Sequence, residues 1–243
     1  MYLVDPRTPI GLPAPPPELA FLVTGEYNSE SLLFDGNMAF HALLAILRKN
    51  DIRPEDFRAI LDFGCGCGRI LRYFHSLKNA QIHGTDYNPD LLDWCRRYLY
   101  FGEFRINGLF PPSTYEDDQF DFIYAISVFT HWPESLQLLW MKEFWRILRP
   151  GAHLLMTAHS ELKHYAHFLS DAEREAFQTG RLVVKCPESH DPLLAAGTNF
   201  CCTFHPVAYV RETLATGFEV TDHVKESWLA GPQSAYLLRK SFV

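Results

Sequence analysis

The feature that most constrains this chain is a glycine-rich turn between an apolar run and a segment of helical periodicity. Residues Ala59–Phe63 are typical of a buried parallel strand. Glycines then alternate at positions 64, 66 and 68, and Arg69–Phe74 is apolar at helical spacing. Because glycine lacks Cβ, a ligand can lie against this backbone. Strand, glycine turn and helix predict the nucleotide-binding start of a doubly wound α/β domain, with the positive end of the helix facing the ligand.

The spacing of the glycines narrows the class of ligand. A dinucleotide-binding fold has G-x-G-x-x-G, whereas here the third glycine comes one residue earlier. The stretch Asp62-Phe-Gly-Cys-Gly-Cys-Gly68 resembles the first motif of the class I S-adenosylmethionine (SAM)-dependent methyltransferases, an acidic residue followed by G-x-G-x-G. The resemblance implies that Asp62, Gly64, Cys65 and Gly66 contact SAM. The alternative is a plain glycine turn.

The second predicted strand, Ala80–Thr85, ends at Asp86. A carboxylate in this place can accept hydrogen bonds from both hydroxyls of a ribose. Pro89–Tyr98 is predicted to be a helix, with its proline in the first turn. The resemblance implies that Asp86 binds the ribose of SAM and that Tyr87 lies beside the adenine. The alternative role for Asp86 is to cap the helix, which Asn88 could also do.

The third predicted strand is Glu103–Asn107. In the family the residues after this strand hold the adenine edge, often through an aspartate. Here Asn107, Gly108 and Leu109 occupy that place. An asparagine amide can both donate and accept hydrogen bonds, so the position departs from the family without losing the chemistry.

A fourth motif follows, in which the acidic turn Asp117–Asp121 leads into a predicted strand, Phe122–Ser127. We place Ser127 among the cofactor-binding residues, since ligands bind at the carboxyl ends of such strands. A helix capped by Ser135 is expected to run to Leu148, and the fifth strand is Ala152–Ala158.

Beyond the fifth strand the regular alternation stops. His159–Gly180 is expected to be helical, residues 181–205 irregular or strand-like, and Pro206–Thr216 helical. The alternating segments Phe218–Val224 and Gln233–Lys240 predict an antiparallel pair. The resemblance implies a three-layer Rossmann-like α/β sandwich with a seven-stranded, mostly parallel sheet in the order 3-2-1-4-5-7-6, strand 7 being antiparallel. We expect a single domain over 1–243, with its SAM-binding core at 57–160 and a cover insertion at 160–205.

The first 50 residues are expected to form an arm and covering helices. Residues 1–20 are rich in proline and predict an extended arm without helix. Asn37 is predicted to cap a helix, Met38–Lys49, whose last turn is basic. The resemblance implies that such helices form one wall of the substrate pocket. Tyr27 is the candidate substrate contact there, and a packed surface aromatic is the alternative.

Two histidines follow strands that end at the ligand-binding edge. His131 comes after the fourth strand and His159 after the fifth. Because histidine titrates near neutral pH, His131 is the first candidate for a general base and His159 the second. His131 and Trp132 are also candidate substrate contacts. A structural role, or positioning of the acceptor, is the alternative for His131.

Composition excludes some partners. The formal net charge of the 243 residues is −7, which argues against a nucleic-acid substrate. No run is long and apolar enough for a membrane span, and the beginning lacks a signal-peptide pattern, so we expect a cytoplasmic protein without a membrane partner. The six cysteines lack C-x-x-C spacing, so we expect reduced, mostly buried thiols and no metal site.

These observations predict a SAM-dependent methyltransferase that acts on an oxygen or nitrogen atom of a small organic acceptor, sugar-like or a natural product. The sulfonium methyl is already activated, so the protein mainly aligns the acceptor and removes its proton. One alternative is a SAM-binding subunit without catalysis, because no residue is an unmistakable base. The other is a nicotinamide-dependent oxidoreductase, against which the glycine spacing counts.

Overall fold

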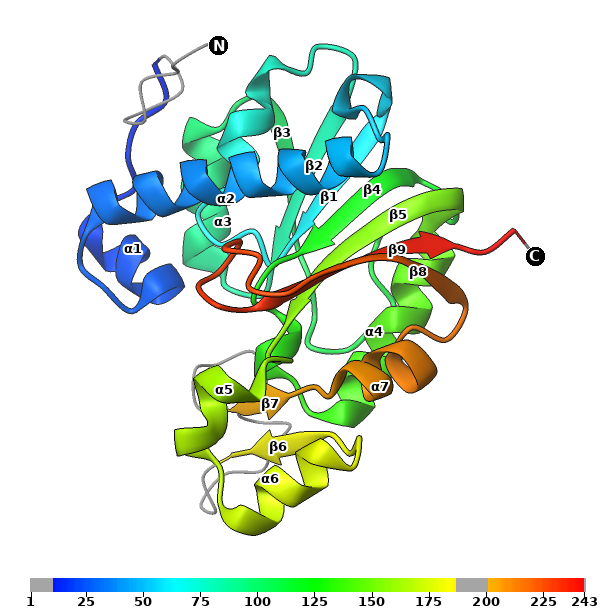
Figure 1. The fold of residues 1–243 in the computed structure, drawn as a ribbon. Helices are drawn as coiled ribbons and strands as arrows, with labels where there is room; N and C mark the ends of the chain where they lie inside the picture. Colours follow the sequence, from blue (N-terminus) through cyan, green and yellow to red (C-terminus); the bar gives the residue numbers. More distant parts are fainter. Residues whose placement is uncertain (1–10, 187–200, 243) are drawn as a thin grey trace. The chain divides into compact units, whose positions relative to one another are not determined.

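The computed structural model describes residues 11–186 and 201–242 (Figure 1). The chain divides into two compact units, one ending at Asn107 and the other beginning at Gly108. Seven strands form one sheet in the order β3-β2-β1-β4-β5-β9-β8. Their bounds are β1 Ala59–Phe63, β2 Gln81–Asp86, β3 Gly102–Ile106, β4 Phe120–Ala125, β5 Leu148–Ala158, β8 Phe218–Val224 and β9 Ser234–Lys240. With the last strand in sequence counted as seventh, this is the predicted order 3-2-1-4-5-7-6, so the predicted fold class is confirmed.

The first unit, residues 1–107, holds three parallel strands. Every residue of β1 is buried, as its uninterrupted apolar run predicts. β1 pairs in parallel with β2, placing Phe63 opposite Thr85, and β2 pairs in parallel with β3, placing Asp86 opposite Ile106. Phe63 and Asp86 therefore end their strands side by side, at the edge where the glycine turn begins.

The helices of this unit correct two expectations. They are α1 Pro17–Thr24, α2 Ser29–Lys49, the 3₁₀ helices η1 Pro54–Asp56 and η2 Leu71–Ser76, and α3 Pro89–Tyr98. The expectation of an arm without helix is wrong for α1, because Pro17 stands at the first helical position, where a missing N–H costs nothing. Asn37 is also not a cap, since α2 begins eight residues earlier, where the Asn28 side chain accepts from Ser31 N. Residues 1–10 of the expected arm lie outside the described part.

The helix expected after the glycine turn is also different in kind. Tyr73 N donates to Ile70 O and Leu77 N donates to Phe74 O, so the segment closes through three-residue steps. It is therefore a 3₁₀ helix that begins at Leu71, not an α-helix from Arg69. The segment after the turn is thus not the expected α-helix whose N-terminus faces the ligand.

The second unit, residues 108–243, holds the rest of the large sheet. β4 and β5 pair in parallel, and β9 pairs antiparallel with both β5 and β8. The predicted antiparallel pair at the end of the chain is confirmed. Helix α4, Glu134–Ile147, begins after Pro133, so Ser135 lies inside its first turn and is not the cap. A short α7, Val207–Tyr209, continues as a π-helical turn, Val210–Leu214, in the predicted helical segment.

A small accessory layer follows the carboxyl end of β5 (Figure 1). It contains α5 Leu162–Tyr165, the 3₁₀ helix η4 Ala166–Phe168, α6 Asp171–Gln178, and the antiparallel strands β6 Val183–Lys185 and β7 Cys202–Phe204. Its core consists of five buried side chains, Tyr165, Leu169, Phe177, Val183 and Phe204. The layer thus has apolar packing of its own and carries β7.

Candidate functional site

The glycine turn is fastened to the end of β2. Gly64 N and Cys65 N both donate to the Thr85 carbonyl, at 2.8 and 2.9 Å. The three alternating glycines all have positive φ, and Gly66 has a φ of 55°. A Cβ on Gly66 would lie 2.8 Å from Cγ2 of Val23 on α1. Glycine is required at this position both by the backbone angle and by the close approach of α1, a contact that the sequence did not reveal.

Asp86 connects this turn to the start of α3. Its Oδ2 accepts from Gly66 N at 2.9 Å and its Oδ1 accepts from Asn88 N at 2.9 Å. The side chain of Asn88, not of Asp86, caps α3 by accepting from Asp90 N and Leu91 N. Burial raises the pKa of Asp86, and the backbone N–H groups of Asn88, Gly66 and Tyr87 act in the opposite direction. Each carboxylate oxygen has further lone-pair capacity, so the group can still accept from a ligand.

Asn107 lies beside the same strand ends. Its Oδ1 is 3.0 Å from the Thr85 hydroxyl, which also lies 2.6 Å from the Arg105 carbonyl, and its N donates to the Asp86 carbonyl. Tyr87 is half exposed, and burial followed by the charge of Asp86 raises its pKa. In the first unit the predicted residues Asp62, Gly64, Cys65, Gly66, Asp86, Tyr87 and Asn107 therefore lie at neighbouring ends of β1, β2 and β3. Their roles toward a cofactor stay predictions.

The thiols around this turn are buried and weakly acidic. Burial raises the pKa of Cys65 well above its usual range and that of Cys67 to about 12. Cys95 Sγ lies 3.4 Å from the Gly66 carbonyl. These groups pack as small apolar side chains. In residues 11–186 and 201–242, no group of three or more His, Cys, Asp or Glu side chains is arranged to hold a metal ion.

In the second unit Ser127 lies two residues past the end of β4 and has a φ of 61°. Its N donates to Thr157 Oγ1 at 2.8 Å, that hydroxyl donates to Gln233 Oε1 at 2.6 Å, and Gln233 Nε2 donates to Ser127 Oγ at 3.0 Å. This closed ring of bonds holds a backbone conformation that is unfavourable for serine. Thr157 and Gln233 carried no sequence signal. Gly108 and Leu109 are the other predicted cofactor contacts in this unit. The Leu109 carbonyl accepts from Trp140 Nε1, and Gly108 is the residue before it.

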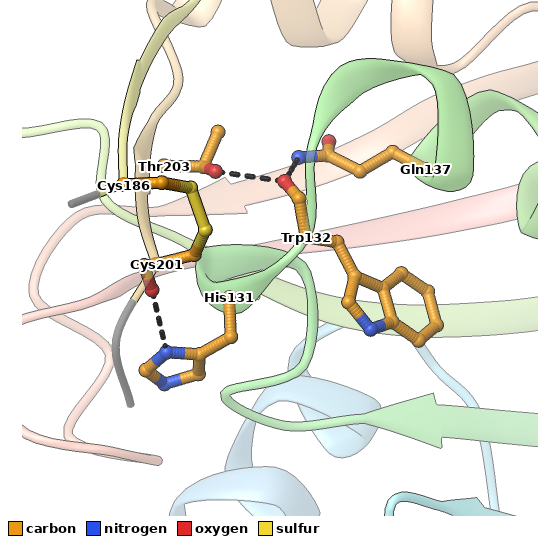
Figure 2. Close-up of a disulfide and its surroundings, with 6 residues drawn as sticks. All are labelled: His131, Trp132, Gln137, Cys186, Cys201 and Thr203. Atoms are coloured by element: carbon orange, nitrogen blue, oxygen red, sulfur yellow. Dashed lines mark hydrogen bonds between the residues drawn. A yellow bond between two sulfur atoms is a disulfide. The ribbon is translucent and has the colours of Figure 1, made fainter. Parts of the chain in front are cut away.

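His131 is held by the backbone of Cys201, the residue just before β7. Its Nδ1 lies 3.0 Å from the Cys201 carbonyl oxygen (Figure 2). Because a carbonyl only accepts, Nδ1 carries the proton, and the neutral ring has its lone pair on Nε2. Burial lowers the pKa of His131, and the bond to Cys201 opposes that shift.

His159 is held in the same way, by the backbone carbonyl of Thr203, two residues beyond Cys201. Its Nδ1 donates to the Thr203 carbonyl at 3.1 Å, and its ring lies 4.3 Å from that of Tyr165 between centroids. Burial, followed by repulsion from His131, lowers the pKa of His159 to about 4. The two candidate bases therefore interact with each other, and both depend on β7, which the sequence predicted only as irregular or strand-like.

The two predicted aromatic contacts differ in exposure. Trp132 has 5% of its surface exposed, stacks on Trp140 at 5.9 Å, and uses its carbonyl to accept from Gln137 and Thr203. Tyr27 is 66% exposed and stacks on Phe21 of α1 at 4.3 Å. Substrate contact stays a prediction for both.

The expectation that all cysteines are reduced is wrong. Cys186 and Cys201 form a disulfide, with 4.5 Å between their Cα atoms (Figure 2). The cause is the pairing of β6 with β7, which brings together two residues that are 15 apart in sequence. Cys65, Cys67, Cys95 and Cys202 are free.

Residues 60–151 match the profile of a family described as a methyltransferase domain. Over these residues the chain is similar to the class I, Rossmann-like methyltransferases. The first motif, the Asp86 position and the strand order agree with that similarity, which implies SAM as the cofactor. The buried carboxylate beside Gly66 N–H, at the carboxyl ends of parallel strands, fits such a cofactor.

The chain is 31% identical over 97 residues to sterol 24-C-methyltransferase erg6 of Schizosaccharomyces pombe, covering 38% of this chain and 25% of that protein. It is 33% identical over 100 residues to methyltransferase GfsG of Streptomyces halstedii, covering 39% and 35%. A SAM-dependent methyltransferase structure from Methanosarcina mazei superimposes with a TM-score of 0.56 at 19% identity, covering 81% of this chain and 98% of that one. The chain thus spans about a quarter to a third of the length of the two named relatives.

Proposed function

We propose that this methyltransferase transfers the methyl group of SAM to an oxygen or nitrogen atom of a small organic acceptor, sugar-like or a natural product. The observation that carries the proposal is the buried Asp86 carboxylate, 2.9 Å from Gly66 N at the end of β2. A carboxylate fixed beside a backbone turn in this way suits the two hydroxyls of a ribose. The match of residues 60–151 to a methyltransferase domain supports it.

The residues that would hold the cofactor are the glycine turn, Asp86, Tyr87 and Asn107 of the first unit, with Gly108, Leu109 and Ser127 of the second. When bound, SAM supplies a methyl group on a positively charged sulfur, which is already an activated leaving group. Asp86 would accept from the ribose hydroxyls, and the Asn107 amide would serve the adenine edge. What remains for the protein is to orient the acceptor and to remove its proton.

His131 is the group that we assign to proton removal, with His159 second. The bonds to β7 place the basic lone pair on Nε2 in both rings. Their lowered pKa values keep both rings neutral at pH 7, the state that a base requires. An acceptor that loses a proton, such as an alcohol or an ammonium group, is the kind that uses such a base, and this favours methylation at oxygen or nitrogen.

The proposed class of acceptor depends on the net charge of the chain and on how much of each relative the chain matches. A net charge of −7 favours a small molecule over a nucleic acid. The sterol methyltransferase is matched over only 97 residues, so its acceptor is not carried over to this chain. Within residues 11–186 and 201–242 no helix has the length and apolar character to cross a membrane. We propose a cytoplasmic enzyme.

Calorimetry with SAM and with NADH, followed by S-adenosylhomocysteine release over a panel of alcohols, amines and a sterol, tests the proposal. We expect binding of SAM and not NADH, and turnover with an alcohol or amine. Binding of NADH alone would support the oxidoreductase and refute the proposal. Turnover only with the sterol, with the new methyl group on a carbon atom of the product, would move the methylated atom to carbon.

A SAM-binding subunit without catalysis is the second candidate. It is favoured by the pKa of about 4 for His159, since a group of that pKa is a weak base. Tight SAM binding with no S-adenosylhomocysteine released over the whole panel would support it.

A further inference from the structure

Cys186 and Cys201 stand opposite each other where the β6–β7 ladder ends. The ladder pairs Val183 with Phe204, Val184 with Thr203 and Lys185 with Cys202, so its next step pairs the two cysteines. Their Cα separation of 4.5 Å is that of directly opposed antiparallel residues without mutual hydrogen bonds. The disulfide therefore closes the end of a hairpin whose strands have only three residues each.

β7 and its flanking residues present alternate side chains to two different surroundings. Phe204 and Cys202 pack with the accessory core. The buried residues Cys201, Thr203 and His205 contact the segment after β4. The disulfide thus holds Cys201, the residue whose backbone carbonyl, at the edge of the strand, bonds to His131.

Hydrogen bonds join these residues to the segment after β4, to α4 and to the end of β5, where His205 N donates to the His159 carbonyl at 2.9 Å. The Cys201 carbonyl accepts from His131, and the Thr203 carbonyl accepts from His159. The Thr203 hydroxyl donates to the Trp132 carbonyl at 2.7 Å, and His205 Nε2 donates to Gln137 Oε1 at 3.0 Å (the first of these two is drawn in Figure 2). Of these, the bond to His131 lies at the disulfide itself, outside the three-residue ladder.

A two-stranded ribbon of this length is marginal without further support. At the Cys201 end, that support is the covalent bond to Cys186. When it opens, the covalent restraint at the Cys201 end is lost, and the carbonyl that fixes the His131 proton on Nδ1 is held less firmly. His159 depends on Thr203, which lies inside the ladder opposite Val184, and is expected to respond less.

The two sulfurs differ in access. Cys186 is partly exposed, whereas Cys201 is fully buried. A thiolate from solution therefore attacks the sulfur of Cys186, and the sulfur of Cys201 leaves. The remaining thiols of the glycine turn are buried and weakly acidic, so they compete poorly in exchange.

We propose that Cys186–Cys201 is a thiol-exchange site that controls His131: the disulfide form fixes the ring for proton removal, and reduction by a cellular dithiol releases it. One thiolate of the dithiol attacks Cys186 Sγ, and Cys201 leaves as a thiolate that takes up a proton. The second thiol of the dithiol then attacks the mixed disulfide and frees Cys186, while the dithiol becomes a cyclic disulfide. This rests on the proposed function, in which His131 is the base. A disulfide in a cytoplasmic protein is more often a sensing device than a permanent brace.

The test compares oxidised protein with protein reduced by dithiothreitol, both full-length. Counting thiols after denaturation should give four in the oxidised form and six after reduction. Nitrogen-15 spectra of the histidine rings should show His131 as the Nδ1–H tautomer before reduction and as a mixture of tautomers afterwards. Turnover with the acceptor found by the panel should fall about ten- to a hundredfold, the order expected for a misplaced catalytic group.

Cys186→Ser should reproduce the reduced state without reductant, and Cys202→Ser, the neighbouring cysteine outside the disulfide, is the matched control and should behave as wild type. Six free thiols in protein purified under air, or an unchanged His131 signal on reduction, would overturn the inference. An equal change of the His131 ring signal in Cys202→Ser and in Cys186→Ser would also overturn the inference, because the effect would then come from altered packing and not from the lost disulfide. Failure of SAM to bind would count against the proposed function alone, since the thiol count and the ring spectra do not depend on it.

Discussion

At the residue scale, one carboxylate has two tasks. Asp86 already accepts from Gly66 N and Asn88 N, so it organises the turn in the absence of a ligand. A group that is fixed before binding loses little freedom when a ribose arrives. The helix-capping task that the sequence left open for it belongs to Asn88.

Asp86→Ala should weaken SAM binding about ten- to a hundredfold, because charge-assisted hydrogen bonds contribute about 1.5–3 kcal/mol. Calorimetry measures the dissociation constant directly. Asn88→Ala is the matched control, expected to cost about 0.5–2 kcal/mol of stability through loss of the cap while leaving SAM affinity unchanged. Equal loss of affinity in the two variants would show that Asp86 acts only through the turn.

His131→Ala should lower turnover about 10²–10⁴-fold if His131 removes the proton. Because burial lowers its pKa, the acidic limb of the wild-type rate profile should lie below pH 6.5, with the rate rising as pH increases through that pKa. The variant should lose this limb at saturating SAM. If the variant keeps both its rate and the acidic limb, the role of general base passes to His159, whose acidic limb would lie near pH 4.

At the scale of elements, α1 and the glycine turn are mutually dependent. Val23 lies so close to Gly66 that no Cβ fits between them, and Gly66 has a positive φ. The turn is therefore shaped by a helix 43 positions earlier in the chain. That contact is invisible in the motif, which would read the same without α1.

Gly66→Ala should destabilise the protein by about 1–2 kcal/mol because of the positive φ alone. The close contact of the new Cβ with Val23 should add a further destabilisation. In the double variant, Val23→Ala should remove the destabilisation that comes from this contact. Denaturant unfolding of both single variants and of the double variant should give a coupling energy of at least about 0.5 kcal/mol. Strict additivity would mean that α1 does not lie on the turn in solution.

At the scale of the whole molecule, three histidines that are buried (His205) or partly buried (His153 and His159) make the fold sensitive to acid. Burial lowers the pKa of His153 and His159 to about 4 and that of His205 to about 3. The unfolded chain takes up these protons near pH 6.5, so it binds more protons than the folded chain between about pH 4 and 6.5. Stability is thus complete above pH 6.5 and is lost as the pH falls through that range.

His205→Gln should reduce that dependence by up to about 1.4 kcal/mol per pH unit, because glutamine does not titrate and its amide can still donate to Gln137. Urea unfolding at pH 5 and at pH 7.5 measures the difference. A wild-type stability that is flat across this range would contradict the assignment of buried neutral histidines.

The sequence by itself determined the strands, because their signals are local. The apolar run of β1, the alternation of β8 and the proline at the start of α3 each act within a few residues, and all three segments were predicted with the bounds that the structure has. The glycine spacing likewise indicated the resemblance to methyltransferases, since each glycine meets a backbone requirement of the turn itself.

Only the tertiary structure decided what surrounds the two candidate bases. The carbonyl of Cys201 lies 70 positions from His131, that of Thr203 lies 44 from His159, and Gln233 lies 106 from Ser127. Backbone carbonyls carry no side-chain signature, and a cysteine pair 15 apart does not reveal its register until the strands pair. Hydrogen bonds that join distant segments arise from strand pairing and packing, so the protonated nitrogen of His131 was fixed by the fold and not by its neighbours in sequence.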